Sequence, residues 1–319
     1  MYPSSSFIMQ VANLYIEMCS RDNEASACLE GLKHVFRYHA VSDITTANHR
    51  IVVCAGSQFE MTPKAAMLWS SPCLGVAGKI TRHRTSLFTR LFARGKEVPR
   101  YSGTEEVVCY RDSSRNVDYF IPKISKWRIA HHVGEHITYV FCDGSVNTSD
   151  GLPSMLLHVI GSQYGCYLLF ASCVAIQGEA SLYMGNGGVG KSTVCMNLIQ
   201  QGAAYMGDDL VLVYRDGTQT MVGSLLFPVK YVDTEQKSKQ EIDIVAQSAQ
   251  RPLLNAPLSR VYLLERKENT TAEPSVIPLQ GEAMFEIMLK KTNKAFTHAD
   301  GHRFADTISF ICDYNHDQR

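Results

Sequence analysis

The chain has 319 residues, which is enough for one large domain or two modest ones, and its apolar and charged fractions of 45% and 19% are ordinary for a globular protein. Its 31 basic and 31 acidic residues cancel, so no overall field attracts nucleic acid or an anionic membrane, and neither is expected as a partner. The first residues do not resemble a signal peptide, and the longest apolar run, 167–176, is too short to span a membrane. The sequence therefore predicts a cytoplasmic protein.

Ten cysteines are scattered along the chain, without a CxxC pair and without a histidine cluster at zinc-ligand spacing. This distribution favours reduced and mostly buried thiols over a disulfide framework or a zinc site.

The first hundred residues predict a small α+β unit. A strand is expected over 7–19, a helix over 23–38 and a second strand over 50–55. Proline and glycine interrupt the pattern over 61–102, which favours a connecting insertion and not a core element. Seven basic residues gather within it over 79–100; they form either a solvated face or an amphipathic surface for an acidic partner.

The pattern of apolar and turn residues changes near residue 103. A second domain is expected to start there, giving domains 1–102 and 103–319. Short strands separated by turn residues come first, followed by a buried helix and one apolar strand. The expected strands are 106–111, 118–122, 127–131 and 136–142, the helix is 153–164, and the apolar strand is 167–176.

A glycine-rich loop follows the next predicted strand, 179–184, and opens a helix over 192–201. The order strand, GxxxxGKS and helix is that of a P-loop. Glycine lets several backbone N–H groups approach a phosphate closely, and the helix N-terminus adds a positive dipole. The residues expected to bind the nucleotide are Gly185, Asn186, Gly187, Gly188, Val189, Gly190, Lys191, Ser192 and Thr193.

Two adjacent carboxylates, Asp208 and Asp209, precede the apolar run 210–214. If this strand neighbours the P-loop strand, one acid can hold a metal ion while the other takes up a proton from an attacking hydroxyl. Taken alone, such a pair is also common in solvated turns before a strand.

Together, the stretch 169–178, the P-loop and the stretch 201–209 resemble the kinase core of the HPr kinase/phosphorylase family, most closely its HPrK-related and lasso-peptide kinases. Asp208 lies seventeen residues after Lys191, which is the interval of that family. The resemblance implies an α/β fold with a PEP-carboxykinase-like P-loop core, and the segments 227–230 and 257–265 fit its later strands. Before residue 150 the likeness is vague.

The resemblance also implies roles for individual residues. Asp208 would be the general base and act with Lys191 in catalysis, while Ser192 and Asp209 would hold Mg²⁺. Thr193 stands where the bacterial HPr kinases often have Glu, as Thr does in many of the peptide-kinase relatives, so this difference is minor. The larger departure is Phe170, because the family commonly has His there and Phe can neither donate a hydrogen bond nor carry charge.

Three further residues have weaker claims to a role. His158 could replace the missing histidine, although a lone His on an apolar helix is more often a core residue. Lys230 and Arg260, near the ends of predicted strands, could contact the phosphoryl group or remain solvated surface charges.

The sequence thus predicts a kinase that uses ATP and Mg²⁺ to phosphorylate a serine-type hydroxyl of a protein or peptide. Two alternatives stay open: a kinase for a small-molecule hydroxyl, and a non-catalytic nucleotide-binding regulatory module, which Phe170 motivates. The sequence names neither the acceptor nor the oligomeric state, and a homo-oligomer is compatible with it.

Overall fold

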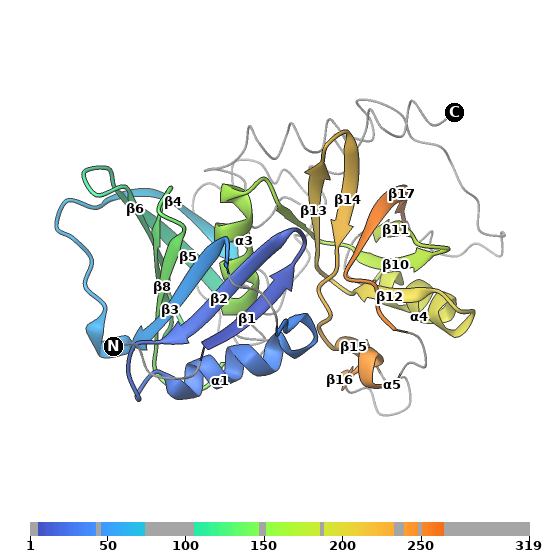
Figure 1. Cartoon of the computed structure of the whole chain (residues 1–319), viewed down its shortest axis with the longest axis horizontal. Coiled ribbons are helices and arrows are strands. Elements are labelled where there is room, and N and C mark those ends of the chain that lie inside the picture. Colours follow the sequence, from blue (N-terminus) through green and yellow to red (C-terminus); the bar gives the residue numbers. More distant parts are fainter. Residues whose placement is uncertain are drawn as a thin grey trace, which may run out of the picture.

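The computed structural model describes residues 6–42, 46–73, 105–146, 151–185, 188–232, 239–247 and 251–264. They form a mixed α/β structure with an eight-stranded sheet on one side and a seven-stranded sheet on the other (Figure 1). This confirms the predicted α/β class.

The first sheet has the strand order β1-β2-β3-β8-β7-β6-β5-β4. Its middle strands β2, β3 and β8 are parallel, while every other pair of neighbours is antiparallel. The strands are β1 (Ser6–Val11), β2 (Leu14–Ser20), β3 (His49–Ala55), β4 (Ala66–Cys73), β5 (Glu105–Asp112), β6 (Val117–Pro122), β7 (Arg128–His132) and β8 (Ile137–Cys142).

Two helices contribute to the core on one face of this sheet. In α1 (Ser26–Val35), Cys28, Leu29, Leu32 and Val35 recur at helical spacing and are buried, so they form the face that packs. The helix α3 (Leu152–Gln163) adds its apolar residues to the same core and also contacts β9 of the second sheet. Two 3₁₀ turns, η1 (Arg37–His39) and η2 (Gly56–Gln58), complete this unit.

Two expectations for the N-terminal part were wrong. The predicted strand 7–19 is a hairpin that turns at Ala12. The sequence does not indicate this turn, because alanine rarely adopts a φ such as the 56° of Ala12. The segment 61–102 is not only a connection, since β4 lies in it and pairs with β5. Residues 74–100, with the basic cluster, lie outside the described residues.

The expected boundary at residue 102 falls inside the first sheet, because β5 to β8 follow it in the chain and continue the same sheet. The change of sheet comes between β8 and β9. We therefore propose a division between Cys142 and Tyr167 in place of 102/103.

The second sheet has the order β12-β10-β11-β17-β14-β13-β9, and only β11 and β17 are parallel. The helix α4 (Lys191–Gln200) packs on it through Val194, Leu198 and Ile199, as the sequence predicts. The strands are β9 (Tyr167–Leu169), β10 (Ser172–Ile176), β11 (Glu179–Met184), β12 (Ala204–Gly207), β13 (Val211–Asp216), β14 (Gln219–Gly223) and β17 (Asn255–Leu263); β15 (Val229–Val232), β16 (Lys239–Ile242) and α5 (Ile244–Gln247) form a small unit beside it.

The predicted apolar strand 167–176 is two strands, and the break between them shapes the sheet. β9 pairs with β13 at one end of the strand order, whereas β10 pairs with β11 and β12 at the other end. Only Phe170 and Ala171 separate β9 from β10, and 208–210 likewise separates β12 from β13. Because such short connections cannot span a flat sheet, its two ends meet. We call these two connections the seam.

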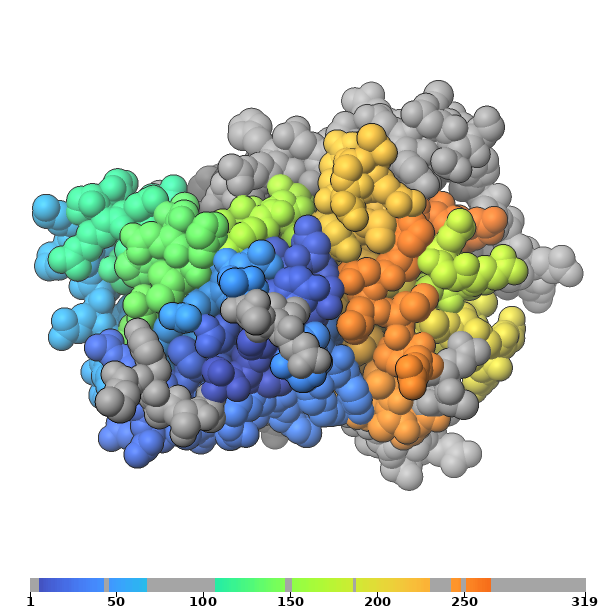
Figure 2. All heavy atoms as spheres, viewed as in Figure 1, coloured from blue at the N-terminus to red at the C-terminus, as the bar shows by residue number. Residues whose placement is uncertain are grey.

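The two units are in direct contact, as the space-filling view shows (Figure 2). The hairpin tip of the first sheet reaches the second, where the Asn255 side-chain amide donates to the Ala12 carbonyl over 3.2 Å. A Cβ on Gly223 would lie 2.9 Å from the Ala12 Cβ, so this close approach requires glycine.

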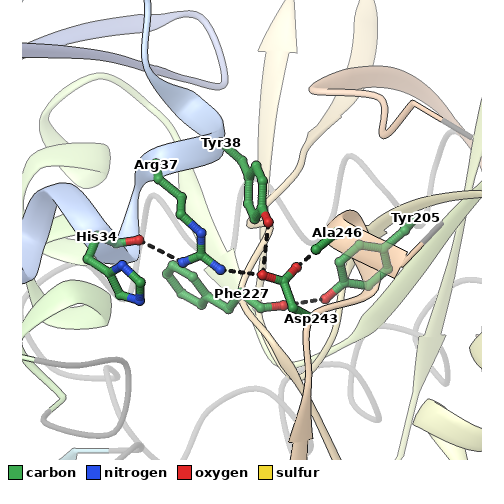
Figure 3. A network of polar contacts seen from close by, with 7 residues as sticks. All are labelled: His34, Arg37, Tyr38, Tyr205, Phe227, Asp243 and Ala246. Carbon is green, nitrogen blue, oxygen red and sulfur yellow. Dashed lines mark hydrogen bonds and ion pairs between the residues drawn. The ribbon is translucent and has the colours of Figure 1, made fainter. Parts of the chain in front are cut away.

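A polar network also joins the units (Figure 3). The Asp243 carboxylate, next to α5, accepts hydrogen bonds from the Arg37 guanidinium and, over 2.8 Å, from the Tyr38 hydroxyl, both on η1. The ion pair is partly exposed, so its contribution to stability is small.

None of the described helices is long and apolar enough to cross a bilayer. Eight of the ten cysteines are buried residues of the described part of the chain, which agrees with the prediction of mostly buried thiols.

Candidate active site

The glycine-rich loop connects β11 to α4, in the predicted order of strand, loop and helix. Gly185 has a φ of 148°, and a Cβ there would lie 2.6 Å from the Leu264 carbonyl at the end of β17. Gly190 has a φ of 107° and precedes the first residue of α4. Only glycine adopts these conformations without strain, which explains two of the four glycines in the motif. Asn186 and Gly187 lie outside the described residues.

Lys191 turns back over the loop and is only 5% exposed. Its ammonium donates to the Gly185 carbonyl over 3.2 Å and lies 4.4 Å from the centre of the Phe170 ring. Burial lowers the pKa of Lys191, while the neighbouring carboxylates of Asp209 and Asp208 oppose that shift. The lysine thus lies at the base of the loop, close to both acids.

The paired acids lie at the seam, directly after β12. A Cβ on the preceding Gly207 would lie 2.9 Å from the Leu210 carbonyl, so the turn requires glycine. Asp209 has a φ of 64°, a conformation that costs a non-glycine residue roughly 1 kcal/mol or more. The strand that the acids precede, β13, does not adjoin β11, because β17 and β14 lie between them.

Asp208 is held by two serines. The Ser192 hydroxyl lies 2.9 Å from both carboxylate oxygens, and the Ser172 hydroxyl donates to one of them. Asp208 is 6% exposed, and burial followed by the charge of Asp209 raises its pKa, although the serine donors act in the opposite direction. A carboxylate with a raised pKa is better suited to take up a proton near neutral pH.

Ser172 is a site residue that the sequence pattern did not single out. It lies in the first position of β10, is fully buried, and pairs in register with Tyr183 near the end of β11. A hydroxyl within an otherwise apolar run needs a polar partner, and that was the available signal. The partner itself depends on the seam, which no local pattern indicates.

The other expected residues are less closely tied to this arrangement. Ser192 hydrogen-bonds to Asp208, whereas the sequence paired it with Asp209 for the metal; Asp209 is half-buried. Thr193 is exposed and Val189 half-buried. Arg260 is exposed on β17, 3.4 Å from the Tyr262 hydroxyl, and the side chain of Lys230 is not described.

His158 lies on α3, whose apolar residues belong to the core of the first sheet. Burial lowers its pKa from 6.5 to about 4. A half-buried, neutral histidine on this helix agrees with the interpretation as a core residue.

Residues 167–230 match the family model described as the HPr Serine kinase C-terminal domain. They include β10, the P-loop, Ser172 and both aspartates. No curated protein matches the chain significantly.

Among solved structures, the chain is similar to the Hpr(Ser) kinase/phosphatase from Coxiella burnetii. The identity is 17%, and the match covers 34% of this chain and 71% of that one with a TM-score of 0.28. At this TM-score the structural likeness carries no argument. The similarity to the HPr kinases rests on the family match, which covers strands and loops that build the site. Over residues 167–230 the chain is thus similar to the HPr Serine kinase C-terminal domain.

Proposed function

We propose that this protein is an ATP- and Mg²⁺-dependent kinase that phosphorylates a serine-type hydroxyl of a protein or peptide, with the second unit as its PEP-carboxykinase-like nucleotide-binding core. The observation that carries the proposal is the hydrogen bond from the P-loop Ser192 to Asp208, because it joins the phosphate-binding element to the acid pair. The family match covers both of these elements.

The oxygen atoms gathered here fit Mg²⁺, which prefers hydroxyl, carboxylate and phosphate ligands. Ser192 and Asp209 would hold the ion, with Asp208 beside them, and the remaining ligands would be phosphate oxygens and water. When bound, Mg²⁺ neutralises charge on the phosphates during transfer.

The chain's own groups have distinct tasks in this proposal. Lys191 and the backbone N–H groups of the P-loop hold the phosphates of ATP. Asp208 orients the acceptor hydroxyl and takes its proton, while the acceptor oxygen forms a bond to the γ-phosphorus and the bond from that phosphorus to the bridging oxygen breaks. The products are the phosphorylated acceptor and ADP.

A non-catalytic nucleotide-binding module is the second candidate, and a specific observation motivates it. Phe170 faces Lys191 at a position where the family commonly has His, so no protonatable side chain occupies this place. A small-molecule acceptor is a variant of the kinase proposal and uses the same residues.

Transfer of label from γ-labelled ATP separates these functions. The purified protein is incubated with Mg²⁺ and, in parallel, with peptide pools, free serine and a host extract, and the Asp208→Asn variant serves as a control. Label on protein or peptide that depends on Asp208 supports the proposed kinase, and label only on serine supports the small-molecule variant. Nucleotide binding without transfer to any acceptor would leave the regulatory module.

A further inference from the structure

The first connection of the seam contacts both charged groups of the phosphate site. Phe170 places its ring 4.4 Å from the Lys191 ammonium, and two residues later Ser172 donates to the Asp208 carboxylate. The two residues that receive these contacts come from other elements, the start of α4 and the end of β12.

The Lys191 ammonium is held from two directions. The Gly185 carbonyl accepts its hydrogen bond over 3.2 Å, and the ring of Phe170 attracts the charge through its electron-rich face. Lysine has a long flexible side chain, and at 5% exposure this one is largely removed from water. Contacts that fix the ammonium before the ligand arrives lower the cost of ordering it on binding.

An aromatic ring differs from a carboxylate as a partner for this lysine. It stabilises the cation without an opposite charge that an incoming phosphate would have to displace. The contact with Phe170 can therefore persist while Lys191 meets a phosphate. The aliphatic side chain of leucine fills similar space but has no such face.

We propose that Phe170 is a positioning residue for the P-loop lysine, with its ring holding the Lys191 ammonium where the phosphates of Mg·ATP bind. This inference rests on the proposed nucleotide-binding function of the same site. It assigns a purpose to the residue at which the chain departs most clearly from its family.

Calorimetry with Mg·ATP tests the inference on the full chain. Phe170→Leu should weaken binding about three- to tenfold, while Phe170→Tyr, which keeps the ring, should remain within about twofold. In the Lys191→Ala background, Phe170→Leu should cause no further loss, because the ring acts through the lysine. Phe120→Leu, in the core of the first sheet, is the matched control and should leave the affinity unchanged.

Unchanged affinity in Phe170→Leu would overturn the inference, as would an equal loss in Phe170→Tyr or a further loss in the Lys191→Ala background. If the wild type itself binds no Mg·ATP, the proposed function fails. The contact between Phe170 and Lys191 is then tested by a measurement without nucleotide. Modification of Lys191 by an amine-directed reagent, followed by mass spectrometry across pH, should reach half its maximal rate at lower pH in Phe170→Leu than in the wild type or Phe170→Tyr. The same midpoint in all three would refute the positioning role.

Discussion

At the scale of single residues, the site depends on a few groups whose chemistry is readable from the sequence. Lys191 and Ser192 follow the glycine-rich loop and are indicated by that pattern, whereas Asp208 and Asp209 are singled out by the resemblance to the kinase family. The sequence does not identify their neighbours. Ser172 and Phe170 belong to the site because of their contacts with Asp208 and Lys191, which form only in the folded chain.

Lys191→Ala should remove most of the affinity for Mg·ATP while the fold persists. A charge-assisted contact to phosphate is worth about 1.5–3 kcal/mol, which corresponds to roughly a ten- to hundredfold rise in Kd. Calorimetry measures the loss, and the thermal unfolding midpoint reports on the fold. Lys33→Ala, at an exposed Glu30 pair on α1, is the control. Unaltered binding and activity in Lys191→Ala would remove the P-loop assignment.

The two aspartates should respond differently to loss of charge. Asp208→Asn keeps the size of the side chain but cannot take up the acceptor proton, so transfer should fall about a hundredfold or more with little change in Mg·ATP affinity. Asp209→Asn should weaken the Mg²⁺-dependent complex, because a neutral amide is a poorer ligand.

Single-turnover transfer and Mg²⁺ titrations of both variants provide the measurement. The reverse pattern would exchange the two roles. That outcome has a structural basis, because Ser192, which would hold Mg²⁺, hydrogen-bonds to Asp208. If neither substitution affects transfer or binding, the kinase proposal fails.

At the scale of elements, the seam determines the position of the candidate site in the second sheet. Both ends of the second sheet approach each other at Phe170–Ala171 and at 208–210, and the P-loop leaves β11 at the same edge because Ser172 pairs with Tyr183. Three separate stretches of chain therefore supply the lysine, the serines and the acids. Burial at this junction raises the pKa of Asp208.

Ser172→Ala should change the pH dependence of the reaction. The Ser172 hydrogen bond lowers the pKa of Asp208, so its removal raises that pKa further, and a base must be deprotonated to act. The acid limb of the kcat/KM profile should therefore move to higher pH, with the rate near its plateau least affected. Ser154→Ala, a buried serine on α3, controls for loss of a core hydroxyl. An unshifted acid limb would show that Ser172 does not tune the base.

At the scale of the whole molecule, the contact between the units contains a buried histidine. The His39 ring, on η1, hydrogen-bonds through Nδ1 to the Gln10 carbonyl over 3.0 Å, while Nε2 accepts from the Leu226 N–H over 3.3 Å. This geometry fits the neutral ring with its proton on Nδ1. Burial lowers the pKa of His39 from 6.5 to about 4.

The folded protein should therefore lose stability as the pH falls. The unfolded chain binds a proton on His39 near pH 6.5 and the folded chain only near pH 4, so the contribution is fully present above 6.5 and decreases between those values. A shift of this size corresponds to about 3 kcal/mol. Thermal unfolding of the wild type and His39→Gln from pH 7 to 4 measures the effect. Equal pH slopes in the two proteins would exclude His39 as a source.

The sequence by itself determined the elements with strong local signals. The glycine-rich loop between strand and helix, the helices α1 and α4 and the strands β5 to β8 were predicted because periodicity, glycine and turn residues act within a few positions. The acid pair was singled out by the family resemblance, which includes its interval after Lys191. These features do not require knowledge of which strands pair.

Strand pairing was decided by the tertiary structure. The break at Phe170 contains neither glycine nor proline, and it exists because β9 and β10 pair at opposite ends of one sheet. The turn at Ala12 and the continuation of the first sheet past residue 102 have the same origin. Since burial and hydrogen bonds between distant strands outweigh local preference, only the folded chain showed that Phe170 would meet Lys191 and that Ser172 would meet Asp208.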